Sequence, residues 1–328
     1  MNEEIKNLNI KAEKYAADLN LLRQEAHKVI VGQEEALEKL VIALISNGHV
    51  FLEGVPGLAK TLMIKTLADC IQCGFVRIQF TPDLLPADIT GTKIYEHKDS
   101  TFKTVKGPIF TNFVLADEIN RAPAKVQSAL LEAMQERQVS IQGDTFPLEK
   151  PFFVLATQNP IESEGTYKLP EAQVDRFMFK LLIGYPKKEE EILIMERFTE
   201  GVTVSVSPVV TAERILEIQS FNRSIYTDRK IKEYVADIVD STRNPEAYKI
   251  NTNGYIEYGA SPRASLWIIL AAKAHALLRG RGYVKPEDVK AVANDVLRHR
   301  IILTYEAEAE EVKSDQIIND ILDRIKVP

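Results

Sequence analysis

Five short apolar segments in the first part of the chain constrain the fold more than any other feature. Most have too many consecutive apolar residues for a strand with one face in water. They lie at residues 49–54, 75–80, 112–118, 152–158 and 179–185, and helical patterns separate them at 60–71 and 123–137. Alternating strands and helices predict a doubly wound α/β fold with a parallel sheet, in which ligands bind at the carboxyl ends of the strands.

The pattern changes after residue 186, where strand-like segments largely stop. Helical segments, several of them separated by proline or glycine, follow at 187–199, 211–222, 228–242, 261–279, 286–298 and 313–325. A further helix precedes the sheet, because Tyr15, Leu19, Leu22 and Ala26 are spaced along one helical face. We therefore expect an N-terminal helix at 1–30, an α/β domain at 31–186, and an all-α domain with a connecting helix at 187–328.

Composition and charge narrow the classes of function. The chain has 41 Lys and Arg against 47 Asp and Glu, a formal net charge of −6, so its bulk charge does not attract nucleic acid or anionic membranes. The N-terminus lacks the build of a secretory signal, and the most apolar later stretch, 266–278, is interrupted by Lys273 and His275. We expect a soluble cytoplasmic protein without a membrane segment or a nucleic-acid partner.

The two cysteines form the pair 70-CIQC-73, a spacing found in redox and zinc sites. They end a helical segment just before the expected cap Gly74, where the helix dipole disfavours a thiolate. A zinc site would need two further ligands at short spacing, and the five histidines are scattered singly. We therefore interpret the pair as structural.

The loop 54-GVPGLAKT-61 leaves the end of the first strand and reads as a phosphate-binding loop. In such a loop, backbone N–H groups hold the phosphates, a lysine neutralises the β and γ groups, and a hydroxyl binds Mg²⁺. Lys60 and Thr61 fit these roles. Ala59 replaces the last glycine of the pattern, and we expect it to be tolerated because a residue entering a helix has an ordinary φ. Alone, the loop is also compatible with a helix cap and a chance lysine.

Two carboxylates, Asp117 and Glu118, end the strand 114-VLADE-118. In this position an Asp serves Mg²⁺, and a Glu orients and polarises the attacking water. Taken alone, an acidic pair after a strand is more often a solvated turn or helix start. Together with the phosphate-binding loop, on successive strand ends, it predicts nucleotide hydrolysis.

Three further polar residues are candidates for the same chemistry. Asn159 follows the strand at 152–158 and can sense the γ-phosphate or the attacking water, although Asn-Pro is also a common turn former. Arg176 and Arg263 can stabilise the charge of phosphoryl transfer, and each is equally compatible with a surface ion pair to an acid such as Asp175.

With these residues in place, the chain resembles the MoxR-type AAA+ ATPases over nearly its whole length. The resemblance rests on 31-VGQ-33, 53-EGVPGLAKT-61, 79-QFTPDLLPADITG-91, 117-DEINRAP-123, 129-ALLEAMQERQVSI-141, 157-TQNP-160, 170-LPEAQVDRF-177 and 259-GASPRA-264, in that order. It implies a P-loop AAA+ fold with a C-terminal all-α lid domain. An ordered set of motifs is far more specific than any single loop.

The resemblance also implies roles for individual residues in an ATPase that uses ATP and Mg²⁺. These are Walker A for Gly54 to Thr61, Walker B for Asp117 and Glu118, sensor 1 for Asn159, an arginine finger toward the neighbouring subunit for Arg176, and sensor 2 for Arg263. The catalytic residues are then Lys60, Glu118, Asn159 and Arg176, and the Mg²⁺ ligands are Thr61 and Asp117. The expected nucleotide contacts are Val31, Gly32, Gly54, Val55, Pro56, Gly57, Leu58, Ala59, Lys60, Thr61, Leu62 and Arg263.

Two insertions resemble those of the AAA+ branch that contains magnesium chelatases and MoxR proteins. Residues 139–148 alternate around a Gly-Asp turn and predict a hairpin before the fourth strand. Residues 91–110 predict a second hairpin, embedded in the second helix of the domain. Either insertion could instead be loop decoration without a partner.

By resemblance we expect a homo-oligomeric ring, a hexamer, that remodels or matures client proteins carrying von Willebrand factor A domains. Alternatives are a magnesium-chelatase-like motor subunit, a DNA-acting AAA+ motor, and a nucleotide-gated scaffold that does not hydrolyse ATP. The acidic balance and the lack of an evident helix-turn-helix disfavour the DNA motor, unless the structure has a basic pore surface. Intact Glu118 and Arg176 disfavour the scaffold.

Overall fold

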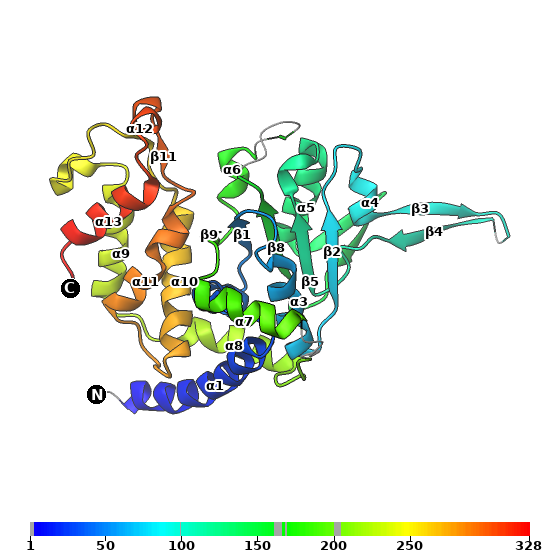
Figure 1. The fold of residues 1–328 in the computed structure, drawn as a ribbon, viewed down its shortest axis with the longest axis horizontal. Helices are drawn as coiled ribbons and strands as arrows, with labels where there is room; N and C mark the ends of the chain where they lie inside the picture. Colours follow the sequence, from blue (N-terminus) through cyan, green and yellow to red (C-terminus); the bar gives the residue numbers. More distant parts are fainter. Residues whose placement is uncertain (1–2, 99, 161–165, 168, 200–204) are drawn as a thin grey trace.

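A computed structural model describes residues 3–98, 100–160, 166–167, 169–199 and 205–328. Its centre is a five-stranded sheet in the order β2-β5-β8-β1-β9, and every neighbouring pair is parallel. The strands are β1 (Val50–Glu53), β2 (Phe75–Gln79), β5 (Phe113–Asp117), β8 (Phe153–Gln158) and β9 (Phe179–Leu182). All five segments expected to be strands are therefore confirmed, and their carboxyl ends share one edge (Figure 1).

Successive residues of the central strands face two different apolar cores. Phe113 and Leu115 pack on one face, in the core that contains α3 (Lys60–Ile71) and α2 (Glu34–Ile45). Val114 and Ala116 pack on the other face, against α5 (Ala124–Glu136). The strands are buried on both sides, which explains their nearly continuous apolar sequences.

Two antiparallel hairpins leave this body. The pair β6 (Gln138–Ile141) and β7 (Asp144–Pro147) is the hairpin expected before the fourth strand. The pair β3 (Gly91–Glu96) and β4 (Thr101–Lys106) projects far from the sheet (Figure 1). The expectation that this second hairpin interrupts a helix is wrong. The five-residue α4 (Pro86–Thr90) precedes it, but no helix follows at 107–112 before β5 begins.

The remainder of the chain is mainly helical. Its helices are α7 (Lys188–Thr199), α8 (Ala212–Ser224), α9 (Arg229–Ser241), α10 (Pro262–Leu278), α11 (Pro286–Leu297), α12 (Tyr305–Ala309) and α13 (Ser314–Arg324), with a 3-10 turn at Pro245–Tyr248. This region is not purely helical, because β10 (Ile256–Tyr258) and β11 (Ile302–Leu303) form a small antiparallel sheet. Before the sheet domain, α1 (Glu3–His27) buries Leu19, Leu22 and Ala26 against α10 and α3. Two shorter helical turns lie at Ile119–Arg121 and in α6 (Glu171–Val174).

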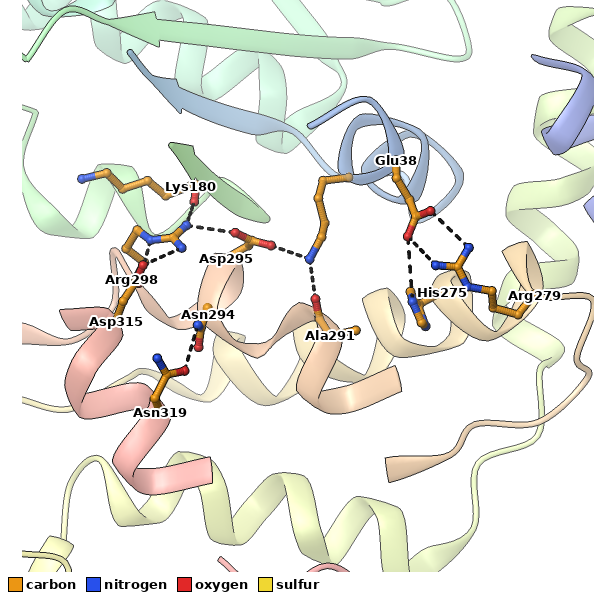
Figure 2. Close-up of polar contacts among 11 residues, drawn as sticks. Glu38, Lys180, His275, Arg279, Ala291, Asn294, Asp295, Arg298, Asp315 and Asn319 are labelled. Carbon is orange, nitrogen blue, oxygen red and sulfur yellow. Dashed lines mark hydrogen bonds and ion pairs between the residues drawn. The ribbon is translucent and has the colours of Figure 1, made fainter. Parts of the chain in front are cut away.

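A network of charged side chains ties α2 to the helical region (Figure 2). Lys39 donates to Asp295 at 2.6 Å and to the carbonyl of Ala291, and its side chain is only 7% exposed. Arg298 donates to Asp295, to Asp315 and to the carbonyl oxygen of residue 180 in β9. The junction between the sheet and α11 is therefore closed by charges that are both buried and paired.

A second group of charges extends the same junction along α10. Glu38 accepts from Arg279 at 2.9 and 3.1 Å and lies 3.9 Å from His275 (Figure 2). His275 in turn contacts Asp288 of α11 at 2.6 Å, and Asp288 also pairs with Arg281. Through the neighbouring residues Glu38 and Lys39, the two groups fix α2 to both α10 and α11.

The cysteine pair occupies the end of α3 as two free thiols. Burial raises the pKa of Cys70 to about 12 and that of Cys73 to about 11. Such thiols carry little thiolate at neutral pH, which supports a packing role. The expected cap Gly74 is wrong, since α3 ends at Ile71 and its C-cap is Gln72, which has a left-handed φ of 57°. Among the described helices, none is both long and apolar enough to cross a membrane.

Candidate nucleotide-binding site

The loop between β1 and α3 begins at the carboxyl edge of the sheet. The Gly54 N–H donates to the carbonyl of Gln158 in β8 at 3.3 Å. A Cβ on Gly54 would lie 3.0 Å from the carbonyl oxygen of Ile183, a tight contact just beyond β9 that favours glycine there. Gly57 has a positive φ of 85°, which glycine adopts without cost. Two of the loop glycines are thus explained by backbone geometry.

Ala59 has a left-handed conformation, with φ 56° and ψ 22°, at the N-cap of α3. The expectation of an ordinary φ at this position is therefore wrong. The turn into α3 needs a left-handed residue, and alanine adopts that conformation at a cost of roughly 1–2 kcal/mol. The general phosphate-binding loop pattern has glycine here, which adopts this conformation without cost, and this chain has the left-handed backbone with a strained alanine.

Lys60 is the first residue of α3, and its amino group donates to the carbonyl of Gly54 across the loop. Burial lowers its pKa, while the negative charges of Asp117 and Glu118 act in the opposite direction. The lysine thus lies in the field of both carboxylates. Thr61 and Leu62 follow in the first turn of α3, where backbone N–H groups have no helical partner and attract anions.

Thr157 organises the two carboxylates at the end of β5. Its hydroxyl donates to Asp117 Oδ1 at 2.6 Å and accepts the backbone N–H of Glu118 at 3.0 Å. Glu118 itself has a left-handed φ of 55°, so the chain turns sharply between the two acids. The strained residue sits at the proposed catalytic position, as is common in active sites.

Two residues of β2 hold the carboxylates from the other side. Arg77 donates to Asp117 Oδ2 at 2.9 Å through Nε, and Gln79 donates to Glu118 Oε2 at 2.7 Å. Arg121 adds an ion pair to the same Glu118 oxygen at 3.1 Å. Sequence reasoning missed these partners. A signal was present, because Arg77 and Gln79 are alternate polar residues in an otherwise apolar strand.

Asn159 follows β8 and is buried at the same carboxyl edge as Gly54 and Asp117. The structure therefore brings five predicted residues to one edge of the sheet: Lys60, Thr61, Asp117, Glu118 and Asn159. Val31 and Gly32 lie near this edge as well, since Gln33 donates its side-chain amide to the carbonyl of Gly184 just beyond β9. Gly32 has a positive φ of 66° and packs against the carboxylate of Glu190.

The two arginines lie at the opposite edge. Arg176 precedes β9, where the N–H of Met178 donates to the carbonyl of His49 immediately before β1. Arg176 and Arg263 line one cavity of about 410 Å³, together with Asn47, His49, Met134, Gln135, Arg137, Leu266, Trp267 and Leu270. Arg263 is 47% exposed on its side chain and pairs with Asp175 at 3.2 Å. The amino and carboxyl edges are separated by the length of β1, so one chain does not bring these arginines to its own Lys60.

Comparison with known proteins agrees with this geometry. Residues 49–179 match the model of the ATPase family associated with various cellular activities, and residues 249–321 match an AAA lid domain. The chain is 50% identical to Chaperone MoxR1 of Mycobacterium tuberculosis over 97% of its own length and 85% of the relative. This chain belongs to the MoxR-type AAA+ ATPases.

Other members of the MoxR-type group are more distant in sequence but match over most of their length. Protein MoxR of Methylorubrum extorquens is 30% identical, over 93% of this chain and 94% of that protein. A crystal structure of a protein from Cytophaga hutchinsonii superposes with a TM-score of 0.93, at 48% identity and full coverage of both chains. The arrangement of the sheet and the helical region is thus that of a solved structure.

Proposed function

We propose that this MoxR-type AAA+ ATPase hydrolyses ATP to ADP and phosphate at sites shared between copies of the chain in a cytoplasmic hexameric ring. One observation carries the proposal. Lys60, Asp117 and Glu118 gather at the carboxyl edge of the sheet, whereas Arg176 and Arg263 gather at the amino edge. A second copy could present its arginine edge to the nucleotide edge of the first, which supports sites that are complete only between neighbours.

The donors near Lys60 fit Mg²⁺, which prefers oxygen ligands in proteins. Asp117 supplies a carboxylate whose Oδ1 is oriented by Thr157, and Thr61 supplies a hydroxyl from the first turn of α3. Asp117 and Thr61 would hold the ion, which would supply positive charge to offset that of the phosphates. Arg77 donates to the other oxygen of this carboxylate, Oδ2, and would have to release it if both oxygens are to be available to the ion.

The remaining roles in ATP binding and hydrolysis fall to Lys60, the start of α3, Glu118 and Asn159. The Lys60 amino group would exchange the Gly54 carbonyl for the β- and γ-phosphates, and the free N–H groups of α3 would hold the phosphates from below. Glu118 would orient the attacking water and accept its proton after leaving Gln79. Asn159 would report the presence of the γ-phosphate by a hydrogen bond.

Both arginines would act on the neighbouring copy. Arg176 would stabilise the charge of the transferring phosphoryl group, and Arg263 would reach the same phosphates from the start of α10. This assignment moves Arg263 from its own nucleotide to that of the adjacent chain.

The nucleoside would lie beside Val31 and Gly32. Next to them is an open pocket of about 590 Å³ between the start of α2, the end of β9 and α11, lined in part by Gln33, Gly184 and Tyr185. A base seated there would contact both the sheet domain and the helical region. The net charge of −6 supports a protein client in preference to nucleic acid.

The mechanical output would be the remodelling or maturation of client proteins that carry von Willebrand factor A domains. A relative with 50% identity is named a chaperone, which supports protein clients. Because each site is shared, hydrolysis at one interface would change the next, and the movement would pass around the ring to the client.

The test is the rate of phosphate release per chain with Mg²⁺ and ATP over a range of protein concentrations. We expect the rate to rise with concentration, Glu118→Gln to lower it at least about 100-fold, and Arg176→Ala to lower it about 1000-fold. Arg229→Ala is the matched control, because Arg229 is a 90% exposed arginine on α9. A wild-type chain that binds ATP and never turns it over would instead support a nucleotide-gated scaffold.

A further inference from the structure

One face of α10 is largely apolar and borders the arginine cavity, with Leu266 exposed and Trp267 and Leu270 half-buried. Arg263, Leu266, Trp267 and Leu270 follow a spacing of three and four residues, so they lie on one side of the helix. All four line the cavity that contains Arg176, and Leu266 is 65% exposed. We call these five residues the arginine face. It combines two cations with an apolar wall, a composition typical of a protein-binding surface.

A second surface with exposed apolar side chains lies on α7, which begins just beyond the carboxyl end of β9. None of the described side chains in α7 is buried, although the helix carries Ile192, Leu193 and Met195. Met195 is 56% exposed. A helix with this much exposed apolar surface normally packs against another body.

The two surfaces have opposite charges. The first turns of α7 contain Glu189, Glu190 and Glu191, and Glu196 lies one turn further on. Glu190 already caps the helix by accepting the N–H of Lys187, but the remaining three acids are exposed. Lys188 and Arg197 only partly balance the four acids of the helix.

The position of α7 is also consistent with a contact to a neighbouring copy. Glu190 contacts Gly32, so the start of the helix lies next to the expected nucleoside site. A neighbour whose arginines reach the phosphates would therefore carry its α10 toward α7. From charge, exposure and position we infer that the arginine face of one copy docks on α7 of the next copy, with Leu266 and Trp267 against Ile192, Leu193 and Met195. This inference rests on the proposed function, because it identifies the surface that closes each shared site.

The contact is heterologous, since two different surfaces meet, and this permits a complementation experiment. Leu266→Glu places an acid on the arginine face opposite the acidic α7, and Met195→Lys places a cation on α7 opposite the arginines, so each new charge lies in an apolar contact and faces charges of its own sign. Each variant alone should fail to assemble with Mg²⁺ and a non-hydrolysable ATP analogue, with a concentration for half assembly at least about tenfold above that of the wild type. An equimolar mixture should assemble again. When chains of the two variants alternate, each interface with both substitutions pairs a lysine with a glutamate, and the next interface keeps both wild-type surfaces.

Sedimentation velocity measures assembly, and a fluorescent ATP analogue measures nucleotide binding by the separate chains. Trp267 is the single tryptophan of the chain, so its emission should move to shorter wavelength on assembly of the wild type. Tyr305→Glu is the control for a surface charge, because Tyr305 is 86% exposed on α12. It should assemble like the wild type.

The outcomes separate the two proposals. If the wild type assembles and both single variants assemble equally well, or if the mixture fails to recover, the contact between α7 and the arginine face is wrong while the ring stands. If the wild type binds nucleotide but never assembles at any concentration, both the ring and this contact are wrong. Failure of each variant alone, followed by recovery in the mixture, supports the docking of these two surfaces.

Discussion

The nucleotide edge and the junction around α2 use the same types of side chain in opposite ways. At the junction, Lys39 and Asp295 are 7% and 12% exposed and make several bonds each. At the nucleotide edge, the Arg77 side chain that pairs with Asp117 is 51% exposed, and Gln79 is an exposed partner of Glu118. Buried pairs are costly to break, whereas exposed pairs exchange readily. The ion pairs of the junction are therefore expected to stay formed, whereas the side chains at the nucleotide edge can exchange their partners.

This difference suggests where movement occurs. The helical region is fixed to α2 and, through Arg298 and Arg300, to the backbone of β9 and the residues before it. ATP-driven movement would then be concentrated at the contacts between chains, more than at a hinge between the sheet and the helices. Four predictions test the contrast, in order of decreasing effect.

Breaking the ion pair between Lys39 and Asp295 at the junction should cause the largest loss of stability. Asp295→Ala leaves Lys39 buried without its carboxylate, and we expect the free energy of unfolding to fall by about 3–5 kcal/mol. Urea unfolding measures it. Asp144→Ala is the matched control, because it removes an exposed partner of Lys93 and should cost under about 1 kcal/mol. The double change Lys39→Met with Asp295→Leu should recover most of the loss, and equal losses in Asp295→Ala and Asp144→Ala would contradict the contrast.

Acid should weaken the fold through two buried histidines. His49 accepts the N–H of Val154 on Nδ1 and contacts the Met134 carbonyl through Nε2, so it must be neutral. Burial lowers the pKa of His49 and of His299 well below the usual value. The unfolded chain takes up protons near pH 6.5 that the folded chain excludes, so stability present above that pH is lost as the pH falls.

The expected slope is about 1.4 kcal/mol per pH unit for each histidine below roughly pH 6. Urea unfolding between about pH 7.5 and about pH 5.5 measures it. His49→Gln should remove about half of the dependence, and His97→Gln, on the exposed hairpin, should leave it unchanged. The prediction fails if the His49 variant keeps the full slope.

Removing Arg77, the exposed partner of Asp117, should change the stability little and should change the affinity for Mg²⁺. Arg77→Gln should change the free energy of unfolding by less than about 1 kcal/mol and strengthen Mg²⁺ binding up to about fivefold, because Asp117 Oδ2 is released. Titration of Mg²⁺ against a fluorescent nucleotide measures the affinity. Lys103→Gln, on the β3–β4 hairpin, controls for the lost positive charge. Unchanged Mg²⁺ affinity would show that the pair does not compete with the metal.

The smallest effect is expected at Ala59. Ala59→Gly should relieve the left-handed strain but increase the freedom of the unfolded chain, for a net stabilisation of about 0.5–1 kcal/mol. Thermal unfolding of the nucleotide-free chain measures it. Ala68→Gly, within the same helix, should be destabilising. Destabilisation by Ala59→Gly would mean that the loop stores no strain there.

The parts predicted from sequence were those specified by local patterns. The apolar runs of β5 and β8 and the order Lys60, Asp117, Asn159 predicted the sheet and one edge of the site, because parallel strands bring their carboxyl ends together. The left-handed φ of Ala59 was missed, because the turn geometry at the start of α3 depends on how closely β1, β8 and β9 approach. Gln79 was missed because its role comes from the neighbouring strand.

The location of Arg263 could not be obtained from sequence spacing. It depends on how α10 packs against α1, α2 and α11, which is fixed by long-range contacts such as Glu38 with Arg279. The resemblance assigned Arg176 to the site of the neighbouring subunit, but it did not say at which edge of the sheet Arg263 lies. The three-dimensional arrangement of the two edges supplies that information.

The β3–β4 hairpin has a mechanical consequence. Its base is anchored by Lys93 to Asp144 and by Lys106 against the rings of Phe110 and Phe146, while Tyr95 and Phe102 make an edge-to-face contact nearer the tip. Strands of this length span roughly 20 Å, so a rotation of roughly 10° at the base displaces the tip by about 3.5 Å. The hairpin (Figure 1) would thus act as a lever arm, in which a small rotation at its base displaces its tip by several ångströms.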